Sequence, residues 1–401
     1  MNGLTRAEFF CLEPVEQQPM LGQVLDWAAI NSGTGNLAGL HAVASLLAEA
    51  FSALPGEVEL VEADPVEKVA ADGRLEAMAY GRHLLLHVRP DAERRVLLTG
   101  HMDTVFAVSH PFQHCEWIGE NALRGPGTAD MKGGLALMLA GLRAFEATRP
   151  QLGYDVLINS DEETGSLSSA RIIREAAQGK IAALTFEPSL PSGAMARARP
   201  GSGNFAAIVT GRSAHAGRNP EDGRNAIVAA SDLALRLAQA RRIGLGINPA
   251  RIDGGGPDNM VPDLAILRFN IRPRGGDDAA AAEKIIARAV GEVSAAHEVM
   301  IKIQGGFTRP PKPIDAGSER LFALVRSAAA DLGEAIDWQD TGGVCDGNNI
   351  AAVGVPVIDT MGARGGEIHS AAEFLLVDSL VERARLTALV LHRLDAGVSL
   401  P

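Results

Sequence analysis

Histidine and acidic side chains follow several short apolar runs in this sequence. The residues concerned are His101, Asp103, Asp130, Glu162, Glu163, Glu187 and His369. Imidazole and carboxylate groups, in the absence of thiolates, are ligands that suit divalent cations of hard to borderline character. Any one of these residues could equally be a strand end, a helix N-cap or a solvated turn. Because they recur in the same kind of position, the whole set predicts a site for two divalent cations.

Two adjacent glutamates, Glu162 and Glu163, indicate the kind of reaction. Neighbouring side chains at the end of a strand point in different directions, so one can bind a metal ion while the other faces a substrate. Metal-assisted hydrolysis needs this division between a ligand and a general base. Asp103 follows His101 by two residues. It could accept a hydrogen bond from the ring of that histidine, or it could support the site in another way.

An α/β layer is required to position these residues. Predicted strands cover 95–101, 154–160, 181–186 and 355–359, and predicted helices cover 131–147, 168–178 and 377–394. The alternation of short apolar strands with helices predicts a mainly parallel sheet with helices on both faces. Ligands of such sheets bind beyond the carboxyl ends of the strands, which is where the histidines and acids lie.

The middle of the chain follows a different pattern. A stretch rich in glycine, proline and arginine at 196–203 and a proline-rich stretch at 309–313 are both typical of joints between domains. Between these joints we expect strands at 205–210, 264–271 and 299–304 and helices at 226–240 and 279–297. We therefore predict an inserted, smaller α+β domain at 196–313 within a discontinuous catalytic domain, 1–195 and 314–401.

The composition argues against several other classes of protein. With a net charge of −12, no basic run and 4% aromatic residues, the chain is not expected to bind nucleic acid or an anionic membrane. No run of about 18 apolar residues predicts a transmembrane helix. The scattered cysteines Cys11, Cys115 and Cys345 do not predict a disulfide framework. Residues 1–20 lack the apolar core of a secretory signal, so we expect a cytoplasmic protein.

Taken together, the motifs resemble those of the di-zinc exopeptidase and deacylase family, from about Arg95 to His392. This family includes carboxypeptidase G-type glutamate carboxypeptidases, aminoacylases, acetylornithine deacetylase and succinyl-diaminopimelate desuccinylase. The motifs are His-Met-Asp-Thr-Val at 101–105, Gly-Thr-Ala-Asp-Met-Lys-Gly-Gly at 127–134, Asp-Glu-Glu-Thr-Gly at 161–165, Ser-Ala-His-Ala-Gly at 213–217, Asn-Met-Val-Pro at 259–262 and Gly-Glu-Ile-His-Ser at 366–370.

The resemblance implies a role for each residue of the metal site. One metal ion would be held by His101, Asp130 and Glu187, and the other by Asp130, Glu163 and His369, so that Asp130 bridges the two. The ions would be zinc, with cobalt or manganese as alternatives. Glu162 would be the general base, taking a proton from the metal-bound water, and Asp103 would support His101. The peptide bond between Asp130 and Met131 would be cis.

The inserted domain resembles the lid of this family, through which the relatives form homodimers. His215 would then reach the active site of a neighbouring subunit and stabilise the oxyanion, although it could instead cap a helix after Gly217. Asn259 and Arg272 resemble residues that bind the free carboxylate of the substrate, although Arg272 could equally form a surface ion pair. Backbone amides near Gly343, in a glycine-rich loop, would also contact the substrate.

Cys345, in the same loop, permits another reading, because relatives usually carry serine or threonine there. A thiol hydrolase with Cys345 and His369 would need an activated thiolate. No strand-to-helix turn in the sequence supports one, and the acidic cluster would have no role.

We therefore predict a metal-dependent hydrolase, a metallopeptidase or amidohydrolase of the metallocarboxypeptidase type. It would cleave a peptide or an N-acyl amino acid and release an amino acid with a free α-carboxylate. Glu187-Pro188 and the segment 196–199 favour a glutamate carboxypeptidase-like enzyme. An N-acyl amino-acid deacylase is the first alternative, and a non-catalytic, metal-stabilised binding protein is a more remote one.

Overall fold

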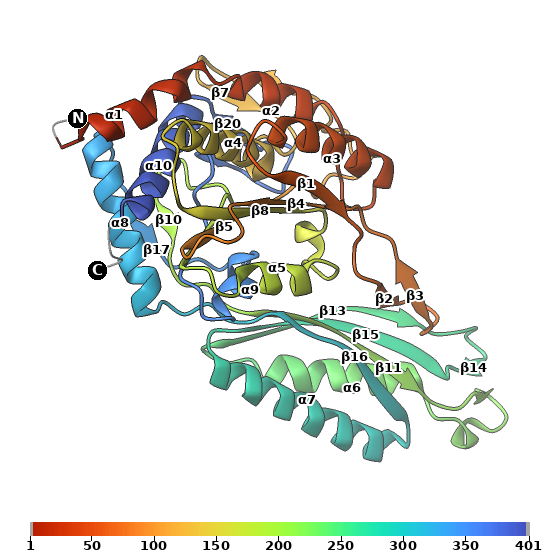
Figure 1. The fold of residues 1–401 in the computed structure, drawn as a ribbon. Coiled ribbons are helices and arrows are strands. Elements are labelled where there is room, and N and C mark those ends of the chain that lie inside the picture. The colour runs from red at the N-terminus through yellow and green to blue at the C-terminus, as the bar shows by residue number, and fades with distance from the viewer. Residues whose placement is uncertain (1–2, 398–401) are drawn as a thin grey trace.

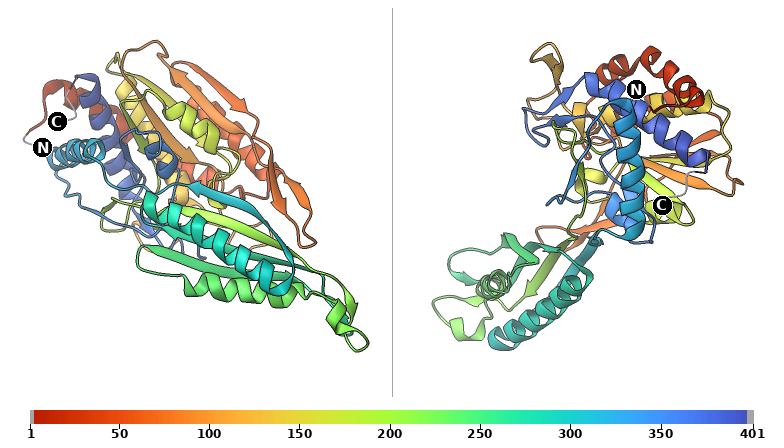
Figure 2. Two further views of the ribbon diagram at one scale, coloured as in Figure 1. Left: turned by 90° about the horizontal axis from the view of Figure 1, so that it is seen from below. Right: turned by 90° about the vertical axis from the view of Figure 1, so that its left-hand side faces the viewer.

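The computed structural model describes residues 3–397, so residues 1–2 and 398–401, at the ends of the predicted catalytic domain, lie outside the described residues. The described chain forms a larger layered body and a smaller, elongated one that extends from it (Figure 1, Figure 2). The smaller body is a continuous middle segment of the chain (Figure 1). Within the described part of the chain, every helix is too short or too polar to cross a lipid bilayer.

A six-stranded sheet forms the centre of the larger body. In spatial order its strands are β1 (Glu57–Val61), β4 (His83–Val88), β8 (Gly153–Asn159), β5 (Arg95–His101), β9 (Ala182–Thr185) and β18 (Val357–Ile358). β8, β5, β9 and β18 pair in parallel, whereas β4 pairs antiparallel with β1 and β8. The mainly parallel sheet confirms the predicted fold class. β1 and β4 come from a segment to which the sequence pattern assigned no strand.

Helices cover both faces of this sheet (Figure 1). The first face is covered by α1 (Arg6–Leu12), α2 (Met20–Ala28), α3 (Leu37–Phe51), α4 (Gly133–Glu146), α8 (Ala316–Leu332) and α10 (Asp378–Asp395). The second face is covered by α5 (Ala170–Ala177) and α9 (Gly347–Ala351). Leu98 of β5 packs in the core of the first face and Leu97 in that of the second, because successive strand residues alternate. A strand buried on both faces explains the uninterrupted apolar run in the sequence.

Short pairings complete the larger body. They are the hairpin β2 (Val66–Val69) with β3 (Leu75–Met78), the pair β10 (Met195–Ala196) with β17 (Trp338–Gln339), and a small sheet in the order β19 (Gly365–Gly366), β20 (Phe374–Leu376), β7 (Ala122–Arg124) and β6 (Glu116–Trp117). The small sheet matters for the site because the loop between β19 and β20 carries His369.

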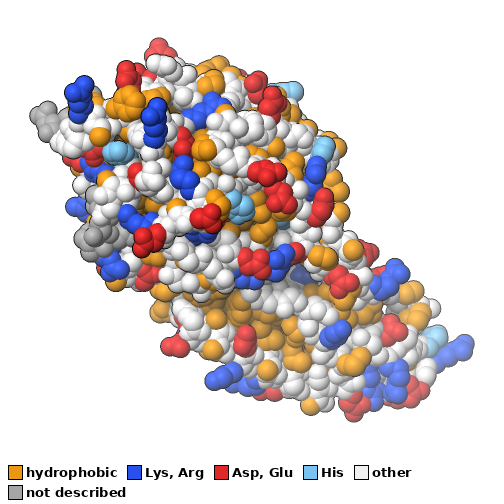
Figure 3. Space-filling view, in the orientation of Figure 1, with side chains coloured by type: hydrophobic (Ala, Val, Ile, Leu, Met, Phe, Trp, Pro, Cys, Tyr) orange, Lys and Arg blue, Asp and Glu red, His pale blue; other side chains and the backbone are white. Residues whose placement is uncertain are grey.

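The smaller body has its own sheet and its own core. Its antiparallel strands lie in the order β13 (Leu245–Gly254), β15 (Leu264–Pro273), β11 (Ser202–Thr210) and β16 (Met300–Arg309), with α6 (Ala226–Gln239) and α7 (Gly276–His297) packed on one face. β13 was not predicted, because Gly246, Pro249 and Gly254 interrupt its apolar pattern and a bulge follows Pro249. Apolar side chains gather on this body near its junction with the larger one (Figure 3), where Val69 of β2 packs against Ala206 and Ile266.

The two joints between the bodies lie side by side. Arg199 and Lys312 exchange both backbone hydrogen bonds, each with an N···O distance of 3.0 Å. β16 extends to Arg309, five residues beyond the predicted strand, because it keeps pairing with β11. Residues before and after the smaller body are therefore held together at the edge of the larger one, and the boundaries at 196 and 313 stay a prediction.

Candidate metal centre

Side chains predicted to bind metal converge at the carboxyl ends of the parallel strands. His101 is the last residue of β5, Glu163 follows β8 in the short helical turn Glu162–Thr164, and Glu187 follows β9 by two residues. Asp130 lies in a kinked turn, Thr128–Lys132, directly before α4. Its peptide bond to Met131 is cis. The loop between β19 and β20 supplies His369.

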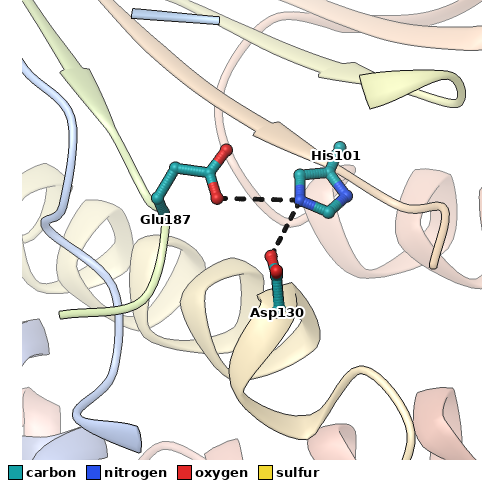
Figure 4. Close-up of side chains that lie close together, drawn as sticks. All are labelled: His101, Asp130 and Glu187. Atoms are coloured by element: carbon teal, nitrogen blue, oxygen red, sulfur yellow. Dashed lines mark hydrogen bonds and ion pairs between the residues drawn. The ribbon is translucent and has the colours of Figure 1, made fainter. Parts of the chain in front are cut away.

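The first cluster consists of His101, Asp130 and Glu187 (Figure 4). Nε2 of His101 lies 3.1 Å from Oδ1 of Asp130 and 3.8 Å from Oε2 of Glu187. All three residues are buried. Hydrogen bonds to Asp103, Asp130 and Glu187 raise the pKa of His101 well above its usual range, although burial opposes this shift.

The second cluster consists of Asp130, Glu163 and His369. Nε2 of His369 lies 3.3 Å from Oδ2 of Asp130 and 3.1 Å from Oε2 of Glu163. Asp130 therefore directs one carboxylate oxygen to each cluster. The His369 side chain is 54% exposed, so this cluster is open to solvent while the first is enclosed.

The donor set fits a pair of divalent cations. Burial raises the pKa of Glu187, and burial together with the charge of Asp130 raises the pKa of Glu163 to about 7. Among the described residues, Oε1 of Glu187 is buried without a hydrogen-bond partner. Buried carboxylates are stabilised by pairing or by a cation. The two clusters, each of histidine and carboxylate groups, therefore suit two ions that share Asp130.

Asp103 supports the site chiefly through its neighbours. Its carboxylate accepts hydrogen bonds from the backbone N–H groups of Glu162 (3.1 Å) and Glu163 (3.2 Å) and from the hydroxyl of Thr34 (2.6 Å). The ring Nδ1 of His101 lies 3.0 Å from the backbone carbonyl of Asp103 and 3.4 Å from its carboxylate. Asp103 thus orients the histidine and also anchors the turn that carries both glutamates.

Glu162 belongs to neither cluster, but it lines the same cavity. Nη2 of Arg309 lies 2.7 Å from its carboxylate and donates to its backbone carbonyl at 2.8 Å. Burial raises the pKa of Glu162 well above its usual range, although the charge of Arg309 opposes the shift. A buried carboxylate beside the metal clusters, rather than within them, is placed as a general base would be.

A cavity of about 270 Å³ adjoins both clusters. Asp130, Glu162, Glu187 and His369 line one end of it. Arg199, Thr341, Gly343, Cys345 and Thr360 line the rest, together with the apolar side chains of Leu190, Met195 and Ile368. The space can hold a small organic substrate against the metal clusters.

The residues predicted from the inserted domain are only partly near this cavity. Arg272 of β15 donates from Nη1 to the carbonyl of Gly342 at 3.1 Å, at the edge of the loop that carries Gly343. Gly343 itself lines the cavity, and its N–H donates to Thr341 Oγ1 at 3.3 Å.

His215 and Asn259 do not line this cavity. His215 belongs to β12 (Ala214–His215), which pairs with β14 (Met260–Val261) at the far end of the smaller body (Figure 1). The N–H of Ala216 donates to the carbonyl of Asn259 at 2.9 Å, so the two residues lie near each other. His215 does not cap the next long helix, because Asn225 is the N-cap of α6.

Cys345 is buried, and its Sγ lies 3.6 Å from Oδ2 of Asp359. Burial raises the pKa of its thiol well above the usual range, which disfavours a thiolate. No hydrogen bond joins Cys345 to His369 in the described part of the chain. The geometry therefore does not support the thiol hydrolase.

Sequence reasoning missed three residues around the site. Arg309 was treated as part of a linker. Arg199 was treated as part of a hinge and of the segment 196–199 that favoured the glutamate carboxypeptidase branch, but it was given no role in the site. Glu373 was not considered, yet it accepts hydrogen bonds from the backbone N–H groups of Gly127, Ala129 and Asp130, at 3.0–3.1 Å. The only signal for Glu373 was its position close after the His369 motif.

An α/β layer that gathers two histidine–carboxylate clusters around one shared aspartate defines the class of dinuclear-metal hydrolases. The comparison with known families agrees. Peptidase family M20/M25/M40 matches residues 97–393, and the chain belongs to this family. It is thus a metal-dependent hydrolase.

Individual relatives carry related names. Carboxypeptidase G2 of Pseudomonas sp. is 28% identical over 397 residues, covering 95% of this chain and 91% of the relative. A succinyl-diaminopimelate desuccinylase of Stenotrophomonas maltophilia is 30% identical over 310 residues, covering 71% and 80%. The solved structure of a family M20 metallo-carboxypeptidase from Sulfolobus solfataricus matches with a TM-score of 0.72 at 13% identity, covering 94% of this chain and 100% of that one.

Proposed function

We propose that this protein is a glutamate carboxypeptidase-like enzyme that hydrolyses an amide bond and releases an amino acid with a free α-carboxylate. The observation that carries this proposal is the placement of Glu162 beside two clusters that share Asp130, with residues of both clusters lining the same cavity as Glu162. The name of the relative that matches most of both chains, a carboxypeptidase, favours this substrate class.

The metal ions would be held by His101, Asp130 and Glu187 on one side and by Asp130, Glu163 and His369 on the other, with zinc as the proposed metal. When bound, the pair would polarise the scissile carbonyl and lower the pKa of a water molecule toward neutrality.

Glu162 would perform the proton transfers. Its carboxylate would accept a proton from the attacking water and deliver it to the nitrogen of the leaving amine. Arg309 holds one carboxylate oxygen of Glu162, and Asp103 holds its backbone N–H. The general base is thereby kept in one orientation, which is the condition for efficient proton transfer.

The smaller body would act as a lid that supplies substrate contacts. Arg272, already at the cavity edge, would bind the α-carboxylate of the substrate together with Asn259, and backbone groups near Gly343 would complete this contact. His215 lies near Asn259 at the far end of the smaller body, away from the cavity of its own chain. We therefore propose that both residues act in the cavity of a second copy within a homodimer.

The proposal is tested with Glu162→Gln, which removes the base and preserves the side-chain shape. We expect kcat to fall by roughly 10²- to 10⁴-fold on dipeptides and N-acyl amino acids, tested with zinc, cobalt or manganese. Metal analysis should still find two ions per chain. The matched control is Glu163→Gln, which should lose metal because this neighbour belongs to a cluster. Full turnover by Glu162→Gln would contradict its role as the base.

An N-acyl amino-acid deacylase is the second candidate, favoured by the 30% identity to a desuccinylase. The same panel separates the two, because a deacylase prefers N-acetyl or N-succinyl amino acids to dipeptides and aryl-glutamate amides. A fully metal-loaded protein that cleaves no member of the panel would support a binding protein instead.

A further inference from the structure

A buried asparagine, Asn348, joins the larger body to both joints of the smaller one. It belongs to α9, which lies beside the junction of the two bodies (Figure 1) and packs in the core of the second face through Ile350. Its side-chain nitrogen, Nδ2, donates to the backbone carbonyl of Pro200 at 2.9 Å and to that of Pro310 at 2.8 Å. Pro200 lies two residues before β11, and Pro310 directly follows β16. One amide group therefore holds both the entry and the exit of the smaller body.

The same side chain also holds the glycine-rich loop beside the cavity. Oδ1 of Asn348 accepts a hydrogen bond from the backbone N–H of Cys345 at 3.1 Å. Cys345 and Gly343, both in this loop, line the cavity. The loop in turn contacts the smaller body, because the carbonyl of Gly342 accepts a hydrogen bond from Arg272 at 3.1 Å. The larger body, the two joints and the glycine-rich loop thus meet at one side chain.

The hydrogen bonds of this amide favour one orientation of the smaller body. Asn348 has no exposed surface, and both of its N–H groups and its oxygen have partners. Moving either joint away would leave a buried donor unpaired, which is unfavourable. Pro200 and Pro310 each have a restricted φ angle, which stiffens the joints. Stiff joints held at their carbonyls leave the smaller body little freedom to rotate.

Two arginines of the proposed mechanism depend on this orientation. Arg309 directly precedes Pro310, and it holds the carboxylate of Glu162. Arg272 belongs to β15, which pairs with β11, the strand that begins after Pro200. Within residues 3–397 no hydrogen bond joins either arginine to Asn348. An effect of the asparagine on them must therefore pass through the backbone of the joints.

We propose that Asn348 is a positioning residue, which sets the orientation of the smaller body and so places Arg272 and Arg309 at the cavity. The effect on catalysis rests on the proposed function, because that function assigns the α-carboxylate of the substrate to Arg272. The effect on the orientation of the two bodies is independent of it and can be measured without a substrate.

Substitutions separate the contacts of Asn348. Asn348→Ala removes all three hydrogen bonds. Asn348→Asp keeps an oxygen that can accept from Cys345, but it replaces the nitrogen that donates to the two proline carbonyls. Asn349→Ala and Asn349→Asp are matched controls. Asn349 is the next residue of α9 and is equally buried, but its only side-chain hydrogen bond in the described part of the chain is with Arg174, at 3.5 Å.

The distance between two spin labels measures the orientation. The labels are attached at Lys284→Cys in α7 and Glu49→Cys in α3, both exposed, in a Cys115→Ser background because the other two cysteines are buried. Dilution with unlabelled protein removes distances between chains. We expect one narrow distance distribution in the parent protein and in the Asn349 controls, and a broadened or shifted one in both Asn348 variants. Distributions like that of the parent in both Asn348 variants would overturn the proposal.

A double-mutant cycle tests the effect on catalysis. Asn348→Ala and Arg272→Ala should each raise KM roughly 10-fold, and the double variant should be close to either single one, because the arginine is already displaced. Metal content should stay at the parent value. Additive losses, which would multiply to roughly 100-fold, would show that Asn348 does not act through Arg272 and would overturn that part of the proposal.

Failure of the proposed function gives a different result. An unchanged KM in Arg272→Ala alone would contradict the assigned contact with the α-carboxylate, and the spin-label distances would then decide the role of Asn348. If Asn348→Ala does not fold, Asn348→Asp takes its place in both experiments. A narrow, unshifted distance distribution in that variant would overturn the proposal, because its two donors to the joints have been replaced.

Discussion

At the scale of single residues, the site depends on one carboxylate that both clusters share and on another that belongs to neither cluster. Asp130 directs Oδ1 to His101 and Oδ2 to His369, which joins two three-residue clusters into one centre. Glu162 is excluded from both clusters by its ion pair with Arg309. Two adjacent glutamates of the same chemistry thereby obtain different environments, and different environments allow different roles.

Arg309 provides a prediction at this scale. Replacing it with methionine removes the partner that orients the Glu162 carboxylate, and it leaves the metal ligands in place. We expect kcat to fall roughly 100-fold with little change in KM, since a misplaced base slows proton transfer rather than binding. Arg309→Lys should recover part of the loss.

Steady-state kinetics on a cleaved substrate check this, together with metal analysis of each variant. A drop in metal content would show that Arg309 stabilises the whole centre, and an unchanged kcat would show that Glu162 is oriented without it.

At the scale of elements, strands and turns bring the ligands together from distant parts of the chain. β5, β8 and β9 end at the same edge of the sheet, so each contributes its following residues to one place. The turn Thr128–Lys132 contributes Asp130 from a different layer. Glu373, next to β20, accepts hydrogen bonds from three backbone N–H groups of this turn and its flank.

The turn therefore provides a prediction of its own. Glu373→Ala should leave three N–H groups without their acceptor and allow Asp130 to move. We expect metal affinity to fall roughly 10- to 100-fold, the usual effect of losing a residue that supports a ligand. Glu373→Gln keeps one carbonyl oxygen at this position and should lose less.

Competition titration with a chelating dye measures both affinities. Tight binding of two ions by Glu373→Ala would mean that the turn holds its shape without this carboxylate.

At the scale of the whole molecule, one chain contains the metal centre but does not bring His215 to it. His215 belongs to β12, which pairs with β14 at the far end of the smaller body (Figure 1), whereas Arg272 donates to the loop beside the cavity. A role for His215 in catalysis therefore requires a second chain, and the proposed homodimer can be tested through activity.

Mixed dimers give a direct prediction. His215→Ala and Glu162→Gln should each be inactive alone. After mixing and subunit exchange, activity should recover to about one quarter of the wild-type value, since half of the dimers are mixed and each has one complete site. Light scattering on the same sample checks the dimer. Failure to recover, with exchange confirmed, would place His215 outside the catalytic site.

Several features could be predicted from the sequence because they depend on local pattern. Apolar runs buried on both faces marked β5, β8 and β9, and the residues that follow them were those gathered at the sheet edge. β4 and β13 were not predicted. In β13 a proline and glycines hide the pattern, and β4 pairs with β8, which is distant in the chain.

The residue types, their spacing and the alternation of short apolar strands with helices were enough to indicate the α/β layer and the cation-binding residues. Only the tertiary structure decided that Arg309 orients Glu162, that Glu373 holds the turn of Asp130 and that Arg199 pairs with Asp359 beside the cavity. These contacts join residues more than 140 positions apart in the chain. The residues next to an arginine in a proline-rich stretch therefore do not indicate which acidic side chain it will pair with. Local pattern encodes elements and their ends, whereas the pairing of buried charges depends on how the whole chain packs.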